Sequence, residues 1–151
     1  MAPGVLPFGG FDLSKLRACI ATSLPTLNLY ASRSIDTLAP PDNEHINELF
    51  GVFLDALQGG KRRSPVAVAK TLHLFGPDLF PLWDTEIAIG YGSWWWLADF
   101  AATEYLSFCS KMKRLAEHVN QCNCARNPVP KKSVLKLIDE YNYSRFTKGW
   151  V

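Results

Sequence analysis

Lys70 and Asp84 are the two residues whose types and positions suggest chemistry. Lys70 lies in an apolar helical stretch beside Val68, Ala69 and Leu72, which predicts an amine that is short of water. Asp84 precedes another helical segment, so we expect one of its oxygens to cap that helix and the other to stay free. A desolvated amine can attack a sugar carbon, and a fixed carboxylate can stabilise the positive charge that develops there.

Aromatic residues cluster near Asp84 in the sequence. They are Trp83, Tyr91, Trp94, Trp95 and Trp96. Three successive tryptophans cannot all face the core, so we expect at least one at the surface, where it can stack on an everted base or wedge into a duplex. Trp83 and Trp95 have a second interpretation as core residues. His73, three residues after Lys70, is either a hydrogen-bonding residue of the pocket or a core histidine with its partners satisfied.

Basic residues form three short clusters that are candidates for contacts with DNA phosphates. The first is Lys61, Arg62 and Arg63, followed by Ser64; the others are Lys111, Lys113 and Arg114, and Lys131 with Lys132. The net charge of the chain is only +2, which permits a polyanionic partner without requiring one. Such clusters can equally be solvated helix faces.

The elements that must position these residues are helices. The 151 residues are 48% hydrophobic, which is enough for the core of one compact domain spanning residues 1–151. Apolar residues recur at helical spacing, no segment alternates as a strand does, and we expect an all-α bundle of six or seven helices. The first expected helix begins at Asp12 and ends at Pro25. The others cover about 27–31, 43–58, 65–75, 85–89, 97–119 and 134–141.

The same features exclude several classes of protein. No apolar run is long enough to cross a bilayer, and the first residues lack the pattern of a signal peptide, so we expect a cytoplasmic protein without a membrane partner. The four cysteines are too few for a disulfide scaffold. Cys109, His118, Cys122 and Cys124 can be considered as ligands for zinc or iron–sulfur, but their spacing matches no familiar site, and we expect no metal and no cofactor.

The segment around Lys70 and Asp84 resembles the core of the helix-hairpin-helix (HhH-GPD) DNA glycosylase superfamily, as a small bacterial-type member. Pro65 precedes Lys70-Thr71 by the family spacing, and Asp84-Thr85 stands where nearly all members keep an essential aspartate. The resemblance implies that Asp84 is the essential carboxylate and Lys70 the Schiff-base lysine of bifunctional members. Val66 and Val68 replace the hairpin glycines, so we expect Arg62 and Arg63 to supply some of the phosphate contacts.

The resemblance implies an enzyme that releases a damaged or modified base from duplex DNA, with or without strand cleavage through a lysine imine. Such an activity serves DNA repair or defence against foreign modified DNA, and the sequence indicates neither the base nor the oligomeric state. Two alternatives stay open. One is a non-catalytic helical module that binds DNA or another protein, and the other is a helical metalloenzyme built on the cysteines and His118.

Overall fold

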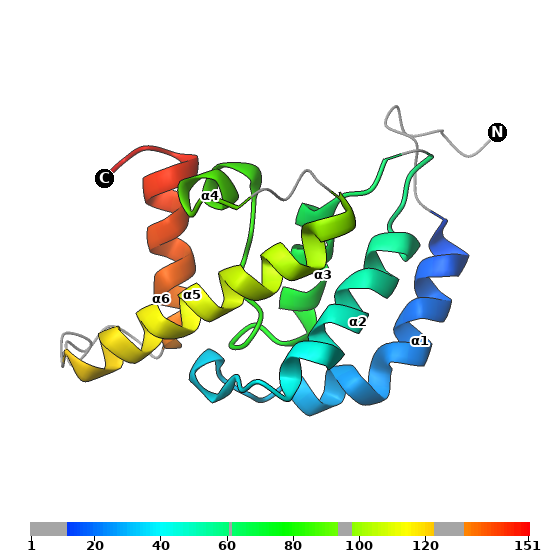
Figure 1. The fold of residues 1–151 in the computed structure, drawn as a ribbon, viewed down its shortest axis with the longest axis horizontal. Coiled ribbons are helices and arrows are strands. Elements are labelled where there is room, and N and C mark those ends of the chain that lie inside the picture. Colours follow the sequence, from blue (N-terminus) through cyan, green and yellow to red (C-terminus); the bar gives the residue numbers. More distant parts are fainter. Residues whose placement is uncertain (1–11, 61, 94–97, 123–131) are drawn as a thin grey trace.

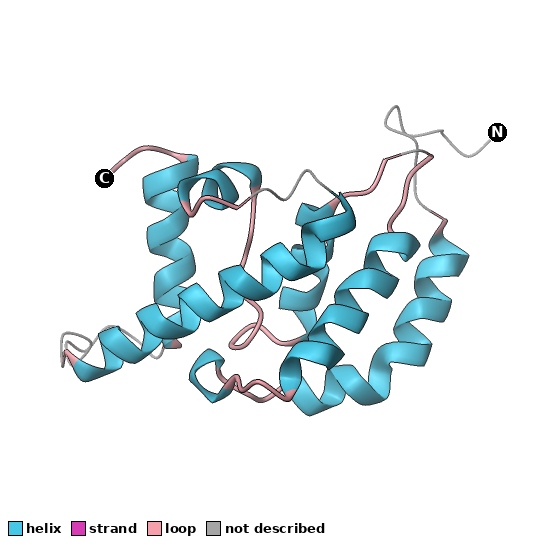
Figure 2. Ribbon diagram, viewed as in Figure 1, coloured by secondary structure: helices cyan, strands magenta, loops and turns pink. Residues whose placement is uncertain are grey.

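The protein is an assembly of helices with a long helix, α5 (Ala101–Gln121), running through its middle (Figure 1). The computed structural model describes residues 12–60, 62–93, 98–122 and 132–151. Within these ranges the regular elements are helical, as Figure 2 shows, and this confirms the expected all-α fold. In the same ranges, no helix is both long enough and apolar enough to cross a lipid bilayer.

The other α-helices in these ranges are α1 (Leu13–Tyr30), α2 (Asp42–Ala56), α3 (Pro65–Phe75), α4 (Thr85–Gly90) and α6 (Val134–Asn142). Short turns of other helix types are η1 (Ile35–Thr37), η2 (Ala98–Phe100) and η4 (Tyr143–Thr147), the last a π-helical turn that continues α6. Helix α5 packs against α2, α3 and α6, and α4 packs against η4. The chain therefore returns at its C-terminal end to the helix that follows Asp84.

Side-chain caps set the helix starts that the sequence predicts. Asp12 Oδ1 accepts the N–H of Ser14 at 2.8 Å at the start of α1. Ser64 Oγ accepts the N–H of Ala67 at 3.2 Å, and Pro65 occupies the first position of α3, where its missing N–H costs no hydrogen bond. The predicted bounds of α3 are confirmed.

Helix α1 contradicts one expectation, because it continues through Pro25 instead of ending there. A proline inside a helix removes one backbone hydrogen bond and crowds the preceding turn. Leu27 and Tyr30, both after Pro25, are 1% exposed. Burial of these two side chains offsets the local loss, so tertiary packing keeps the segment helical.

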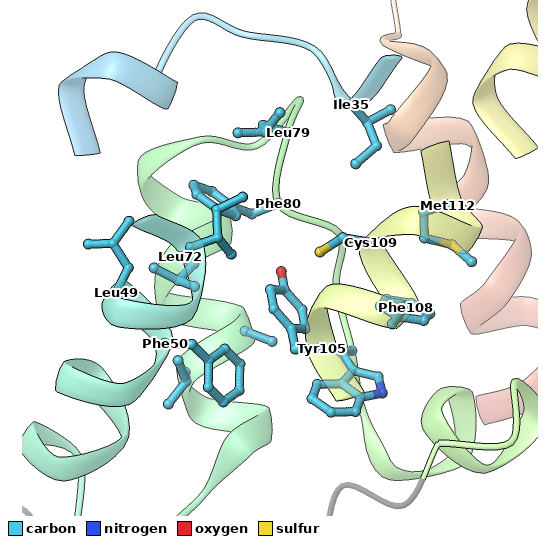
Figure 3. Close-up of a cluster of buried hydrophobic side chains, with 14 of the residues drawn as sticks. Ile35, Leu49, Phe50, Leu72, Leu79, Phe80, Tyr105, Phe108, Cys109 and Met112 are labelled. Carbon is cyan, nitrogen blue, oxygen red and sulfur yellow. The ribbon is translucent and has the colours of Figure 1, made fainter. Parts of the chain in front are cut away.

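The core lies between α5 and the helices α2 and α3, and Figure 3 shows part of it. Helix α5 contributes Tyr105, Phe108, Cys109 and Met112, while Phe50 comes from α2 and Leu72 from α3. Leu79 and Phe80, from the turn after α3, belong to the same cluster, as do Ile35 and Leu49. The segment between α3 and α4 is therefore anchored by burial and is not a loose loop.

Trp83 lies within this core and is 1% exposed. Its ring stacks on Phe108 with centroids 6.0 Å apart, and the ring of Tyr105 lies 5.4 Å away. The interpretation of Trp83 as a base-pocket or wedge residue is thus wrong, and its alternative as a core residue is confirmed. An aromatic ring buried in this way contributes roughly 3–5 kcal/mol to stability relative to alanine.

Helix α6 buries two polar residues together with two apolar ones. The buried residues are Leu135, Ile138, Asp139 and Asn142. Leu137 is only partly buried, and Tyr141 is 50% exposed. Asn142 enters the interior because its Oδ1 accepts the hydroxyl of Tyr91 at 2.6 Å, and Asp139 accepts a backbone N–H there. The apolar residues left on the outer face line a surface hollow instead.

Candidate functional site

Of the two predicted catalytic residues, Asp84 is the one whose side chain is fixed by hydrogen bonds. Its Oδ1 accepts the N–H of Ile87 at 2.8 Å and so caps α4, as the sequence predicts. Its Oδ2 accepts the hydroxyl of Thr147 at 2.6 Å, so the expectation of a free second oxygen is wrong. Thr147 belongs to η4, 63 residues further along the chain, a partner that the sequence could not indicate. Asp84 is partly buried, and two donors hold its carboxylate in one orientation.

Lys70 is exposed, which contradicts the expectation of an amine short of water. Val68, Ala69 and Leu72 are fully buried, so the apolar neighbours of Lys70 in the sequence face the core while Lys70 faces away. The structure therefore gives Lys70 no sheltered position next to Asp84.

A second carboxyl group, Asp139, lies close to the segment that leads to Asp84, and no local pattern in the sequence indicates it. Its Oδ1 accepts the N–H of Leu82 at 3.2 Å, while its buried Oδ2 has no hydrogen-bond partner. Burial raises the pKa of Asp139 to about 7; the Leu82 N–H and Lys136 oppose this shift, and Glu140 adds to it. The carboxyl group of Asp139 therefore titrates near neutral pH.

His73 connects α3 to the same segment. Its Nδ1 donates to the carbonyl oxygen of Phe80 at 2.8 Å and lies 4.0 Å from Oδ2 of Asp139. The side chain is 17% exposed. This arrangement is that of a largely buried histidine that fixes a loop, the second of its two predicted interpretations.

A hollow of about 390 Å³ lies beside this segment. Its lining residues are Leu82, Lys136, Asp139, Glu140, Tyr143, Ser144 and Trp150. The rings of Tyr143 and Trp150 meet edge to face, with centroids 6.3 Å apart, and the ammonium of Lys148 lies 5.6 Å and 6.0 Å from the two rings. Asp84 does not line the hollow, but Leu82 precedes it by two residues and η4 holds its carboxylate. In the sequence, the signal that could have indicated this hollow is the pair of aromatic residues Tyr143 and Trp150 on either side of Lys148.

Tyr91 is partly buried and does not line this hollow. Its hydroxyl donates to Asn142, and its ring lies 5.6 Å from that of Phe108 and 5.2 Å from that of Phe146. Trp94, Trp95 and Trp96 lie outside the described residues, as do Lys61 and Lys131. Their predicted roles stay predictions.

The predicted phosphate-binding residues are distributed over several elements, and most already have partners. Arg62 and Arg63 are exposed in the turn before α3, where Arg63 lies 3.4 Å from Asp55, and Ser64 Oγ is used as a helix cap. Lys132 binds both carboxylate oxygens of Glu140 at 2.9 Å.

Of the three predicted phosphate-binding residues on α5, two have hydrogen-bond partners and one is exposed. Lys111 donates to the carbonyl oxygen of Tyr91 at 2.7 Å, and Lys113 donates to that of Leu38 at 2.5 Å. Arg114 is exposed. Arg62 and Arg114 are exposed, and neither forms an ion pair with another described residue.

The possible metal ligands do not converge in the described residues. Cys109 is 1% exposed within the core, and burial raises the pKa of its thiol well above the ordinary range. His118 Nε2 lies 3.5 Å from Cys122 Sγ near the end of α5. No group of three or more metal-binding side chains occurs among the described residues, and Cys124 lies outside them.

Comparison of the chain with protein-family models, curated protein sequences and solved structures gave no match. The resemblance to the HhH-GPD superfamily therefore depends on the motif residues alone. Of these, the structure holds Asp84 in a defined geometry and leaves Lys70 in solvent.

Proposed function

We propose that the protein is a DNA glycosylase that releases a modified base by hydrolysis, with Asp84 as the essential carboxylate. Breaking an N-glycosidic bond builds positive charge on the sugar, and a preoriented carboxylate stabilises that charge without reorganising. The observation that carries the proposal is the double anchoring of Asp84 by the N–H of Ile87 and the hydroxyl of Thr147. The same carboxylate can orient the attacking water.

The exposure of Lys70 favours hydrolysis over imine formation. A lysine that acts as a nucleophile must lose its proton, and desolvation or a neighbouring cation normally promotes that loss. Lys70 has no such burial, so the proposal assigns it no covalent role. Strand cleavage through Lys70 is accordingly not part of the proposed activity.

The hollow next to Leu82 is the proposed place for the everted base. The edge-to-face rings of Tyr143 and Trp150 offer an aromatic surface, and Trp150 is 70% exposed. Stacking on such rings offsets the cost of removing a base from the duplex. Lys148, which lies over both rings, and Lys136, which lines the hollow, are cations available to a nearby phosphate.

A second candidate is a non-catalytic module that binds DNA or a protein. One observation favours it: a helix cap and a contact with Thr147 account for both oxygens of Asp84 in purely structural terms. In that case Asp84 supports the fold, and the exposed cations are binding groups only.

The test is base release from a panel of duplexes that each carry one modified base, assayed as abasic sites. We expect release from at least one duplex, and a loss of about 100-fold or more for Asp84→Asn, the effect of removing one preorganised electrostatic group. Asp78→Asn, at an exposed turn position, is the matched control and should keep the wild-type rate. Far-UV circular dichroism shows whether each variant is folded.

Two results would overturn the proposal. If folded Asp84→Asn releases the base at the wild-type rate, Asp84 is not the essential carboxylate. If the wild type binds duplex DNA but releases no base from any member of the panel, the binding module is the better description.

A further inference from the structure

A second and larger hollow, of about 680 Å³, lies between α5, α6 and η4. Its lining residues are Tyr91, Lys111, Arg114, Leu115, Val119, Leu137, Ile138, Tyr141 and Phe146. This volume is in the range of small-molecule sites, which are mostly apolar with a few convergent polar groups. The hollow exists because α6 turns Asp139 and Asn142 inward and leaves Leu137 and Tyr141 on the outer side.

The two charged residues that line this hollow, Lys111 and Arg114, are both cationic. Lys111 and Arg114 lie three residues apart on α5, so their side chains occupy the same face and repel each other. No carboxylate is present among the described residues that line the hollow. Arg145 places a third cation 5.7 Å from the ring of Phe146.

These cations also retain hydrogen-bonding capacity. The ammonium of Lys111 gives one donor to the carbonyl oxygen of Tyr91 and has two more. Arg114 has no ion pair with any residue in the described part of the chain, and its guanidinium carries five donors. By contrast, the hydroxyl of Tyr91 is already used by Asn142. An incoming group that satisfies these donors must therefore be an acceptor, and an anion would also relieve the repulsion.

We propose that this hollow binds a small organic anion, with its apolar or aromatic body against Leu115, Leu137 and Phe146 and its carboxylate or phosphate on Arg114 and Lys111. The body and the charge are both required. Inorganic phosphate lacks the contacts with the apolar wall, and a neutral aromatic molecule leaves the cations unpaired. The site goes beyond the proposed glycosylase, which uses Asp84 and the aromatic rings of the other hollow.

The test compares four probes on the full chain by isothermal titration calorimetry. The probes are 1-naphthyl phosphate, neutral 1-naphthalenemethanol, 1-naphthylmethylammonium and inorganic phosphate. We expect naphthyl phosphate to bind saturably and at least about tenfold more tightly than the other three, as expected for charge-assisted hydrogen bonds. The Arg114→Gln variant should bind naphthyl phosphate about tenfold more weakly than the wild type does. Arg17→Gln, an exposed arginine on α1, is the matched control and should change nothing.

Charge reversal gives a sharper result. Arg114→Glu should lose the preference for naphthyl phosphate and bind the naphthyl ammonium better than the wild type does. The proposal is overturned if no probe binds saturably, if the neutral probe binds as tightly as naphthyl phosphate, or if folded Arg114→Gln and Arg114→Glu leave the order of affinities unchanged. Base release is measured by a separate assay, so failure here leaves the proposed glycosylase intact.

Discussion

Asp84 and Asp139 are two carboxyl groups that stabilise the same short segment in different ways. Each accepts one backbone N–H, from Ile87 and from Leu82 respectively. Asp84 also accepts a hydroxyl from Thr147, whereas the second oxygen of Asp139 is buried without a partner. The two aspartates have similar backbone contacts and therefore differ mainly in the number of hydrogen-bond donors that reach each carboxyl group.

The fold therefore gives these two residues of the same type different chemical roles. The carboxylate of Asp84, held by two donors, keeps one orientation, which suits electrostatic stabilisation. A buried carboxyl with one donor holds its proton more strongly, so burial raises the pKa of Asp139 to about 7. The protonation of Asp139 therefore changes near neutral pH. The proposed chemistry depends on Asp84 instead.

The largest effect on stability should come from Asp139→Asn, which removes the titrating group. Because the folded-state pKa of about 7 exceeds the unfolded value, the stabilising proton is fully effective below about pH 4 and is lost as the pH rises through 7. Wild-type stability should thus fall over that window, by roughly 1–4 kcal/mol from this group.

Urea unfolding at pH 5, 6, 7 and 8 measures this effect. The stability of Asp139→Asn relative to the wild type should increase across the series. His73, Lys136 and Glu140 also face or adjoin Asp139, so His73→Gln serves as a parallel series that separates the titration of the histidine. Parallel pH profiles for the wild type and Asp139→Asn would contradict the assignment.

A smaller effect on stability should come from Thr147→Val. This variant leaves the carboxylate of Asp84 with one hydrogen-bond donor, the same number that Asp139 has. Loss of a hydrogen bond to a charged group should cost about 1–2 kcal/mol in the free energy of unfolding. Thr147→Ser keeps the hydroxyl and should recover most of that stability. Chemical denaturation of both variants measures the difference, and equal stability for Val and Ser would show that the hydroxyl contributes nothing. In the glycosylase assay, Thr147→Val should also release the base more slowly than Thr147→Ser.

The smallest effect should come from Lys70→Ala. Since Lys70 is exposed, the variant should unfold within about 0.5 kcal/mol of the wild type. Its rate of base release should stay within about threefold, and borohydride should trap no adduct between wild-type protein and DNA. A borohydride-trapped adduct that disappears in Lys70→Ala would restore the lysine as a nucleophile.

Local signals in the sequence were sufficient for most helix bounds and failed where tertiary packing competes with them. Ser64 and Pro65 predicted the start of α3 because a cap and a first-turn proline act within four residues. Pro25 misled because the burial of Leu27 and Tyr30, which depends on α1 docking, exceeds the local cost of a proline.

The candidate site shows the same limit more clearly. That Asp84 caps α4 followed from its position before Thr85, and its backbone partner is three residues away. The partner of its second oxygen is Thr147, and Asp139 meets Leu82 across 57 residues. No pattern within a short window predicts contacts of that separation.

By itself, the sequence determined that the chain is helical, where most helices begin, and that Asp84 caps one of them, because apolar periodicity and capping act over a few residues. Only the tertiary structure decided that Trp83 is buried, that Lys70 is exposed and that Asp139 is a buried acid. These properties depend on which face of each helix meets its neighbours, and that choice belongs to the packing of the whole chain.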